Sequence, residues 1–344
     1  MSKKKVKVGN LTLGDGKIYI QSMLNIPAEK VDETVRQAVA LEKAGCEIVR
    51  AAIPTIEDVR LIPAIKDKVN IPLVADIHFD YRIALAAVEA GVDKVRINPG
   101  NIGGTDRVKA VADACRRKNV PIRIGVNSGS LERKLLEKYG SPTPEALVES
   151  ALGHVKLLND CDFDDIVISI KSSDVRLMIA AYRLLAQQVD YPLHLGVTEA
   201  GTERMGLVKS AVGIGSLLCD GIGDTIRVSL TADPVREIYA AKDILRACDM
   251  GGGVQIVSCP TCGRTKIALI PLAEEVEKLC ADIDKPIKVA VMGCVVNGPG
   301  EAREADIGIA GGNGEGILFK KGKILRKVPE DRLLKELSKE IELL

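Results

Sequence analysis

The stretch PLVADIHFDYRIALAAVEAGVDKVRINPG, residues 72–100, contains one complete unit of strand, helix and strand. PLVADIH and KVRINPG are short apolar runs of β-forming residues. YRIALAAVEAG between them has apolar residues at helical spacing and ends on a glycine. A strand followed by a helix and a further strand is typical of a parallel β/α fold.

The same unit recurs from the N-terminus to about residue 245. We predict eight strands there, over residues 18–23, 46–52, 72–78, 94–100, 121–127, 164–171, 191–200 and 224–230. Eight strands alternating with helices predict an α/β fold of the TIM type, a (β/α)8 barrel whose site lies at the carboxyl ends of the strands. A doubly wound open sheet is the alternative, because a sequence pattern does not show closure.

The regular alternation of strand and helix changes after Gly251-Gly252-Gly253. We predict three further strands there, VQIVSC, IKVAVMGC and ADIGIAG, and a helix over residues 264–281. A hairpin is predicted for ILFKKGKIL, and an amphipathic closing helix for DRLLKELSKEIELL. We therefore predict two domains, a barrel over residues 1–248 and a smaller α/β domain over residues 249–344.

Composition narrows the range of functions. The 344 residues carry a net charge of +1, and aromatic residues make up 3% with no Trp, so neither a basic field nor stacking platforms recruit nucleic acid. The basic start MSKKKVKVGN precedes no apolar signal-peptide core, and no stretch approaches the ~20 apolar residues of a membrane span. We expect a cytoplasmic protein. Its nine cysteines, an odd number, favour reduced thiols or metal ligation over a disulfide framework.

Charged and polar side chains stand near the ends of the predicted barrel strands. Strand residues two apart share a face, and five such sets occur there: Asp76 with His78, Arg96 with Asn98, Arg123 with Asn127, Ser169 with Lys171, and Arg227 with Ser229. Arg50 ends the second strand and Glu199 the seventh. Any one of these could be a structural charge, but burying so many cations without counterions is costly. Because the arginine fork matches phosphate, we predict a small ligand that bears a diphosphate.

The glycine-rich segment GIGSLLCDGIGD, residues 213–224, has two interpretations. Its backbone N–H groups could bind phosphate at the last strand-to-helix junctions, or its glycines could serve only tight turns. The segment matches no dinucleotide fingerprint, and the chain contains no P-loop. His154 and His194 lie in apolar surroundings and are predicted to be packed structural histidines.

Three cysteines of the second domain have the spacing of a metal site. Cys259 and Cys262 form C-x2-C, which is common to zinc and iron–sulfur sites, and Cys294 follows another predicted strand. Cys280 is predicted to pack in the core, and the five cysteines of the first domain are interpreted as small buried hydrophobes: Cys46, Cys115, Cys161, Cys219 and Cys248. Glu301 is the nearest carboxylate after Cys294, and from spacing alone it could be a fourth ligand or a solvent-facing loop residue.

The motifs SCPTCGR, MGCVVNGPGEA, VRINPGNIG and RIGVNSGS closely resemble those of the short bacterial 4-hydroxy-3-methylbut-2-enyl diphosphate synthases, and the resemblance covers essentially the whole chain. It implies reductive ring opening and dehydration of 2-C-methyl-D-erythritol 2,4-cyclodiphosphate in isoprenoid precursor biosynthesis. It also implies a [4Fe–4S] cluster held by Cys259, Cys262, Cys294 and Glu301, with electrons from flavodoxin or ferredoxin.

The resemblance further implies a substrate-binding set of Arg50, His78, Arg96, Asn98, Arg123, Asn127, Lys171, Arg227 and Ser229, with Glu199 as a catalytic acid. It implies a head-to-tail homodimer in which the barrel of one subunit meets the cluster of the other. The alternative is a phosphate-binding barrel lyase or aldolase whose second domain holds a structural zinc.

Overall fold

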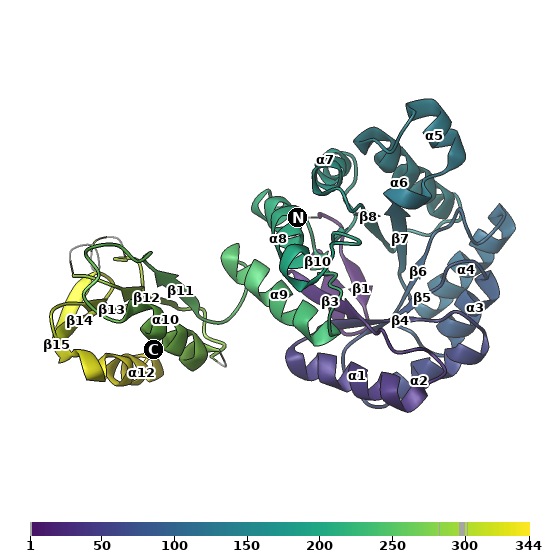
Figure 1. The fold of residues 1–344 in the computed structure, drawn as a ribbon. Coiled ribbons are helices and arrows are strands. Elements are labelled where there is room, and N and C mark those ends of the chain that lie inside the picture. Colours follow the sequence, from purple (N-terminus) through teal and green to yellow (C-terminus); the bar gives the residue numbers. More distant parts are fainter. Residues whose placement is uncertain (1, 282, 296–299, 301) are drawn as a thin grey trace. The chain divides into compact units, whose positions relative to one another are not determined.

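The computed structural model describes residues 2–281, 283–295, 300 and 302–344. The chain divides into two compact units, Met1–Ile244 and Leu245–Leu344. In the first unit, helices form an outer ring around a set of strands (Figure 1).

The eight predicted strands of the first unit are all present, each inside the segment expected for it. They are β3 (Tyr19–Met23), β4 (Ile48–Ala52), β5 (Leu73–Asp76), β6 (Lys94–Ile97), β7 (Ile122–Asn127), β8 (Ile166–Lys171), β9 (His194–Leu195) and β10 (Thr225–Ile226). They form one parallel sheet in the order β8-β7-β6-β5-β4-β3-β10-β9.

The two edges of this sheet come together. A parallel bridge joins Ile168 of β8 to Leu193, just before β9, and the Ile168 N–H donates to the Pro192 carbonyl at 2.9 Å. The sheet therefore closes as a barrel, and the alternative of a doubly wound open sheet is wrong.

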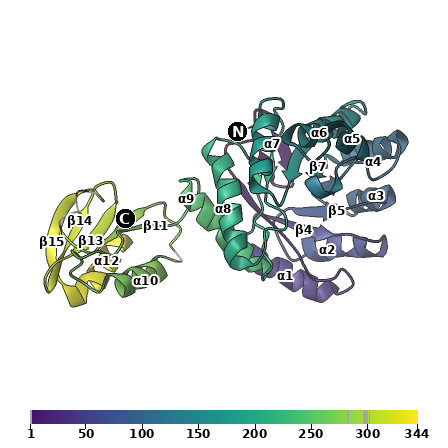
Figure 2. The ribbon, with the colours of Figure 1, turned by 45° about the horizontal axis from the view of Figure 1, so that its top comes forward.

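Helices follow most of the barrel strands and lie outside them, as the turned view of Figure 2 shows for α1 to α3. They are α1 (Val31–Ala44), α2 (Leu61–Lys66), α3 (Tyr81–Glu89), α4 (Thr105–Lys118), α5 (Arg133–Tyr139), α6 (Pro144–Asn159), α7 (Val175–Ala186), α8 (Glu203–Cys219) and α9 (Pro234–Ala247). Local signals set their ends. Asp80 caps α3 by accepting from the Arg82 N–H, and α1 stops at Gly45, whose φ of 99° suits only glycine well.

An N-terminal hairpin that the sequence analysis did not predict packs at the amino ends of the barrel strands. Its strands are β1 (Val6–Val8) and β2 (Leu11–Leu13). Val6, Val8 and Leu13 are fully buried in a cluster with residues that begin the barrel strands, among them Tyr19 and Ile48. The hairpin thus packs beneath the barrel, at the end opposite the predicted site.

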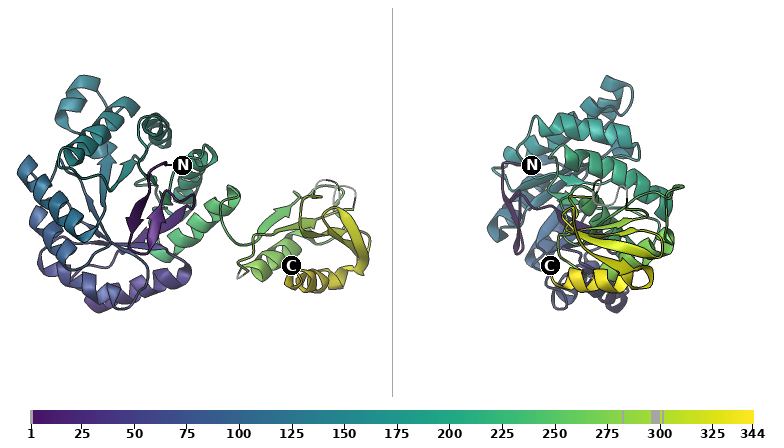
Figure 3. Two further views of the ribbon diagram at one scale, coloured as in Figure 1. Left: turned by 180° about the vertical axis from the view of Figure 1, so that it is seen from behind. Right: turned by 90° about the vertical axis from the view of Figure 1, so that its left-hand side faces the viewer.

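The second unit is built on a five-stranded sheet in the order β11-β12-β13-β14-β15. Its elements are β11 (Gln255–Ser258), α10 (Leu269–Cys280), β12 (Lys288–Met292), β13 (Ile307–Gly311), β14 (Glu315–Lys320), β15 (Lys323–Pro329) and α12 (Leu333–Glu342). The strands β11, β12 and β13 are parallel, and β14 and β15 form the predicted hairpin. Helices α10 and α12 lie on the same face of the sheet and share its apolar core (Figures 1 and 3).

Two expectations about single residues are wrong. Cys219 is exposed and Cys248 is half-buried, because both stand at helix ends, where turns face solvent. In the glycine-rich segment 213–224, Gly221 and Gly223 precede β10 and Gly213 lies inside α8, so these glycines do not follow the carboxyl end of a barrel strand; Gly213 has a packing role. A Cβ there would come within 2.8 Å of Val197, so this glycine permits close helix packing. Among the described residues, no helix is both long enough and apolar enough to span a membrane.

Candidate functional site

The barrel interior toward the carboxyl ends of the strands, called the mouth here, gathers the basic side chains predicted from the strand ends, although Arg123 is the second residue of β7 and lies deeper than the strand end. Arg50, Arg96, Arg123 and Lys171 lie on β4, β6, β7 and β8, and each is buried, with at most 8% of its surface exposed. Arg227 follows β10, and 18% of its side chain is exposed. Arg96 and Arg123 are register partners on neighbouring strands. Alternation along the strands turns these side chains inward, as expected from the sequence.

Asp76 at the end of β5 is the carboxylate shared by two of these arginines. It accepts from Arg50 Nη2 at 2.5 Å and from Arg96 Nη1 at 3.1 Å, and His78 Nε2 lies 3.4 Å away. Burial alone would raise the pKa of Asp76, but the Arg50 guanidinium, with help from His78 and Arg96, holds that pKa well below its ordinary value. Asp76 therefore stays ionised and fixes both guanidinium groups.

Glu237 is the second buried carboxylate of the mouth, and the sequence analysis missed it. It lies on α9, accepts from Ser22 Oγ at 2.9 Å, and stands 3.4 Å from Arg227 Nη2. A sequence signal for it exists. Glu237 shares a helical stripe with Ala241 and Ile244, both buried, and a charged residue on such a stripe needs a buried partner.

Arg123 and Lys171 have no carboxylate of their own among the described residues. Nε and Nη1 of Arg123 are buried without a hydrogen-bond partner in the described structure. Burial, followed by the charges of Arg50 and Arg96, lowers the pKa of Arg123 well below its ordinary value. Burial, followed by Arg227, does the same to the pKa of Lys171. Counting only described residues, five cations of the mouth, four of them buried, face the two carboxylates Asp76 and Glu237. An excess of this kind is suited to an anionic ligand.

Two glycines make room for this arrangement. A Cβ on Gly125 of β7 would lie 2.8 Å from Arg96 Nε, and a Cβ on Gly196 would lie 2.7 Å from the Arg227 carbonyl oxygen. A side chain at Gly125 would displace the Arg96 guanidinium, and a side chain at Gly196 would displace the backbone of Arg227.

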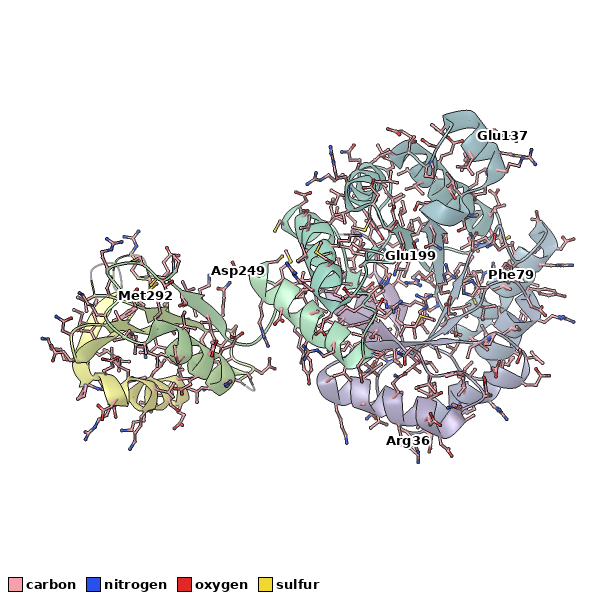
Figure 4. The ribbon with its side chains drawn as sticks, viewed as in Figure 1. Arg36, Phe79, Glu137, Glu199, Asp249 and Met292 are labelled. Carbon is pink, nitrogen blue, oxygen red and sulfur yellow. The ribbon has the colours of Figure 1, made fainter. Side chains whose placement is uncertain are left out.

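The remaining residues of the predicted set are less buried. His78 has 54% of its side chain exposed, while Asn98, Asn127 and Ser229 are half-buried at the ends of β6, β7 and β10. Glu199 is exposed in the loop after β9 with a left-handed φ of 50°, an uncommon conformation for a residue with a Cβ. Figure 4 labels Glu199 and Phe79, which is 72% exposed beside His78 and comes from the loop after β5.

Two of the predicted metal ligands follow neighbouring strands of the second unit. Cys259 follows β11 and Cys294 follows β12, and these strands pair in parallel with Ser258 opposite Val291. The Gly293 N–H donates to Cys259 Sγ at 3.2 Å, which ties the two strand ends together. Backbone N–H donors of this kind stabilise a thiolate, the form in which cysteine binds metal.

Cys262 is exposed, and the groups around it favour its thiolate form. The backbone N–H and the side chain of Arg264 lower the pKa of Cys262. Glu301, the predicted fourth ligand, lies outside the described residues. In the part of the chain that the structure describes, no group of three or more His, Cys, Asp or Glu side chains is arranged to hold a metal ion. The reduced thiols and the N–H donor at Cys259 nevertheless suit an iron–sulfur cluster.

Comparison with known families matches both units. The model of the GcpE TIM-barrel domain matches residues 3–242, and the model of the GcpE protein C-terminal domain matches residues 255–343. Together they cover most of the chain.

Curated relatives match over nearly their full length. A 4-hydroxy-3-methylbut-2-en-1-yl diphosphate synthase (flavodoxin) of Clostridium perfringens is 61% identical over 98% of this chain and 98% of its own. The enzyme of the same name from Fusobacterium nucleatum is 60% identical over 98% of this chain and 96% of its own.

Among solved structures, dihydropteroate synthase from Stenotrophomonas maltophilia aligns with a TM-score of 0.54 at 13% identity. The alignment covers 71% of this chain and 97% of that one. At this identity the similarity concerns the barrel fold alone.

Proposed function

Because the chain belongs to the GcpE family, we propose that its barrel mouth binds 2-C-methyl-D-erythritol 2,4-cyclodiphosphate and that its second unit delivers the reducing electrons. The chain is an oxidoreductase of isoprenoid precursor biosynthesis that forms 4-hydroxy-3-methylbut-2-enyl diphosphate, with flavodoxin as electron donor. The observation that carries the substrate proposal is the excess of buried cations at the mouth, where Arg123 forms no ion pair with any described residue.

The reaction requires two electrons and two protons for each substrate molecule. A ring C–O bond to phosphate breaks, a carbon–carbon double bond forms, and a hydroxyl group leaves as water. The diphosphate becomes acyclic and gains negative charge when that ring bond breaks. Cations already in place at the mouth stabilise the gained charge, since they need no reorganisation during the step.

The mouth residues divide into three groups under this proposal. Arg123 and Lys171, for which the described residues offer no carboxylate partner, bind the diphosphate directly. Arg50, Arg96 and Arg227 are held by Asp76 or Glu237 and present their remaining N–H donors in fixed positions. His78, Asn98, Asn127 and Ser229 line the rim, where we propose that they bind the hydroxyl groups and outer phosphate oxygens.

Glu199 is proposed as the acid that protonates the departing hydroxyl group. Its exposed position in the loop after β9 supports this role, because the side chain can reach a ligand in the mouth and exchange protons with water. The left-handed φ of 50° is a backbone outlier of the kind found at functional sites.

We propose that Cys259, Cys262, Cys294 and Glu301 hold a [4Fe–4S] cluster. When bound there, the cluster would supply electrons one at a time at low potential, which no side chain can do. The thiols contribute the negative charge that binds iron, and the Gly293 N–H that donates to Cys259 offsets part of that charge. A carboxylate in place of a fourth thiol would leave one iron with a hard, exchangeable ligand.

A barrel lyase or aldolase with a structural zinc is not favoured. Relatives about 60% identical over almost the whole chain carry the name of the reductive synthase. The head-to-tail homodimer and the cytoplasmic location remain proposals that rest on the family resemblance and on composition.

Turnover of the anaerobically purified protein tests the proposed function. The protein, reconstituted with iron and sulfide, is mixed with reduced flavodoxin and the cyclic diphosphate, and product and oxidised flavodoxin are quantified. We expect one 4-hydroxy-3-methylbut-2-enyl diphosphate for every two electrons withdrawn. A colourless protein that binds zinc and cleaves a carbon–carbon bond in a phosphorylated substrate would instead support the lyase.

A further inference from the structure

Lys94, the first residue of β6, is fully buried inside the barrel, two residues below Arg96 and its register partner Arg123. It precedes Arg96 by two positions, so both side chains share the inner face of the strand, and its Cα lies about 6.6 Å deeper. Its Nζ has no hydrogen-bond partner within the described structure. A buried ammonium without a partner is among the most costly groups that a protein interior can hold.

Among the described residues, the titratable groups whose charges act on Lys94 are cationic or neutral. Arg123 of β7 and Arg50 of β4 act on it most strongly, and His194 of β9 lies near enough to feel its charge. Its register partner on β5 is the apolar Val74. Asp76, further along β5, is bound by Arg50 and Arg96, while neighbouring Asp93 is bound by Lys66 and the Leu73 N–H. No carboxylate is therefore available to Lys94 from the described strands on either side.

Burial, followed by the charges of Arg123 and Arg50, lowers the pKa of Lys94 to about 7. Above pH 7 the free protein thus holds a neutral amine at this position. A dianion bound at Arg123 would favour the ammonium form, because opposite charge nearby stabilises the charged state.

We propose that Lys94 takes up one proton from solvent when the cyclic diphosphate binds at the mouth, and so becomes an additional cation beneath Arg123. The amine lone pair accepts this proton, and no other bond changes. The inference rests on the proposed function, since it takes the diphosphate as the anion. It adds a residue that the strand-end pattern does not contain, because Lys94 begins its strand.

The arrangement has a physical benefit for the barrel. A permanent sixth cation would repel the five others whenever the mouth is empty. A neutral amine avoids that repulsion in the free protein and supplies charge only when the ligand is present.

Calorimetric titration with 2-C-methyl-D-erythritol 2,4-cyclodiphosphate at pH 8, in two buffers of different ionisation enthalpy, measures the protons bound with the ligand. Lys94→Met keeps the length and loses the amine, and Lys94→Gln keeps a polar group without a titratable proton. Lys109→Met is the control, because Lys109 is exposed on α4. Thermal melts of all four proteins show whether each is folded.

We expect both Lys94 variants to take up about one proton fewer than the wild type and to bind about tenfold more weakly. Lys109→Met should match the wild type in both respects. Lys171, whose pKa is also lowered, is present in all four proteins. Any proton that Lys171 takes up is therefore counted in every titration and does not affect the difference between the Lys94 variants and the wild type.

Two negative outcomes differ in meaning. If the folded Lys94 variants bind the cyclic diphosphate with the same proton uptake as the wild type, the role of Lys94 is overturned. If the wild type itself does not bind the cyclic diphosphate, the proposed function fails before Lys94 is tested.

Discussion

Arg123 is the residue on which the substrate proposal depends most. It is 1% exposed and two of its nitrogens are unpartnered within the described structure, so the free protein bears the cost of an uncompensated charge. Proteins retain such costs at functional sites, where a ligand restores the balance. The alternation of side chains along a strand predicted Arg123, because the face of the strand on which a residue lies depends only on its position in that strand. It could not predict Glu237, whose contact with Arg227 joins a helix to a strand end through the tertiary fold.

Replacing Arg123 by Met should abolish high-affinity binding while leaving the protein folded. Met occupies a similar volume and removes an unpaired charge, so the melting temperature should not fall. Loss of a buried charged contact to phosphate is expected to weaken binding about 100-fold or more, measured by calorimetry.

Arg36→Met is the matched control, because Arg36 is exposed on the outer side of α1, as Figure 4 shows. Equal affinity of the Arg123→Met and Arg36→Met proteins for the cyclic diphosphate would remove Arg123 from the binding site.

Lys94 also makes a prediction for stability without ligand. The folded protein holds its pKa at about 7, well below the ordinary lysine value, so above pH 7 the unfolded chain binds one proton more than the folded chain. The free energy of unfolding therefore gains about 1.4 kcal/mol per pH unit from Lys94 as the pH rises from 7 toward 10.

The Lys94→Met protein lacks this dependence. It should exceed the wild type in stability by a constant margin below pH 7, and that margin should shrink steadily above pH 7. Denaturant melts at pH 6, 7.5 and 9 measure the difference, and a margin that is the same at all three values would show that Lys94 remains charged.

At the scale of elements, the barrel strands and their helices follow from local patterns. β-Branched runs, helical periodicity and terminal glycines identified all eight strands in order. The hairpin β1–β2 was missed because strands of three residues beside a basic terminus carry too little alternation. The glycines of residues 213–224 combine two roles that look the same in sequence, since Gly213 permits close packing of α8 whereas Gly221 and Gly223 serve a turn with positive φ.

A side chain at Gly125 of β7 should displace Arg96. In Gly125→Ala the new Cβ would lie 2.8 Å from Arg96 Nε, so the guanidinium must move and its contact with Asp76 weakens. We expect a folded protein with binding of the cyclic diphosphate reduced about tenfold or more.

Gly153→Ala on α6 is the comparison. An added Cβ there would meet no described side chain within 4 Å, and alanine is more favourable than glycine inside a helix. This variant should bind normally and melt slightly higher. Normal binding by Gly125→Ala would show that the position of Arg96 does not matter for the ligand.

The ends of β11 and β12 carry the cluster proposal. Cys294→Ser should lose most iron and sulfide and the broad visible absorption after anaerobic reconstitution, because a serine hydroxyl is a poor iron ligand. Binding of the cyclic diphosphate to the barrel should remain.

Cys219→Ser controls for the loss of a thiol as such, since Cys219 is exposed at the end of α8. It should keep full iron and colour. Retention of both by Cys294→Ser would contradict the ligand assignment.

At the scale of the whole molecule, the proposed substrate site and the proposed cluster site lie in different units of the chain. The cations of the mouth lie in the unit that ends at Ile244, and the proposed cluster ligands Cys259, Cys262 and Cys294 lie in the unit that begins at Leu245. The length of the chain and the change in the strand-and-helix pattern near residue 250 predicted two domains. Sequence patterns are local to each unit and carry no information on how one unit is arranged against another.

The homodimer inferred from the resemblance predicts complementation. If the barrel of one subunit works with the cluster of the other, a mixed dimer of Arg123→Met and Cys294→Ser subunits contains one intact pairing. The two chains are co-expressed with different affinity tags, and the mixed dimer is purified through both tags. This mixed dimer should have about half of the wild-type activity. A mixed dimer as inactive as either parent would show that each chain uses its own cluster.

Turnover of the two single variants tests the separation of roles most directly. Under anaerobic conditions with reduced flavodoxin and the cyclic diphosphate, the wild type should form 4-hydroxy-3-methylbut-2-enyl diphosphate. Arg123→Met should form almost none although its cluster is intact, and Cys294→Ser should form none although it binds substrate. Product formed by either variant at the wild-type rate would contradict the account.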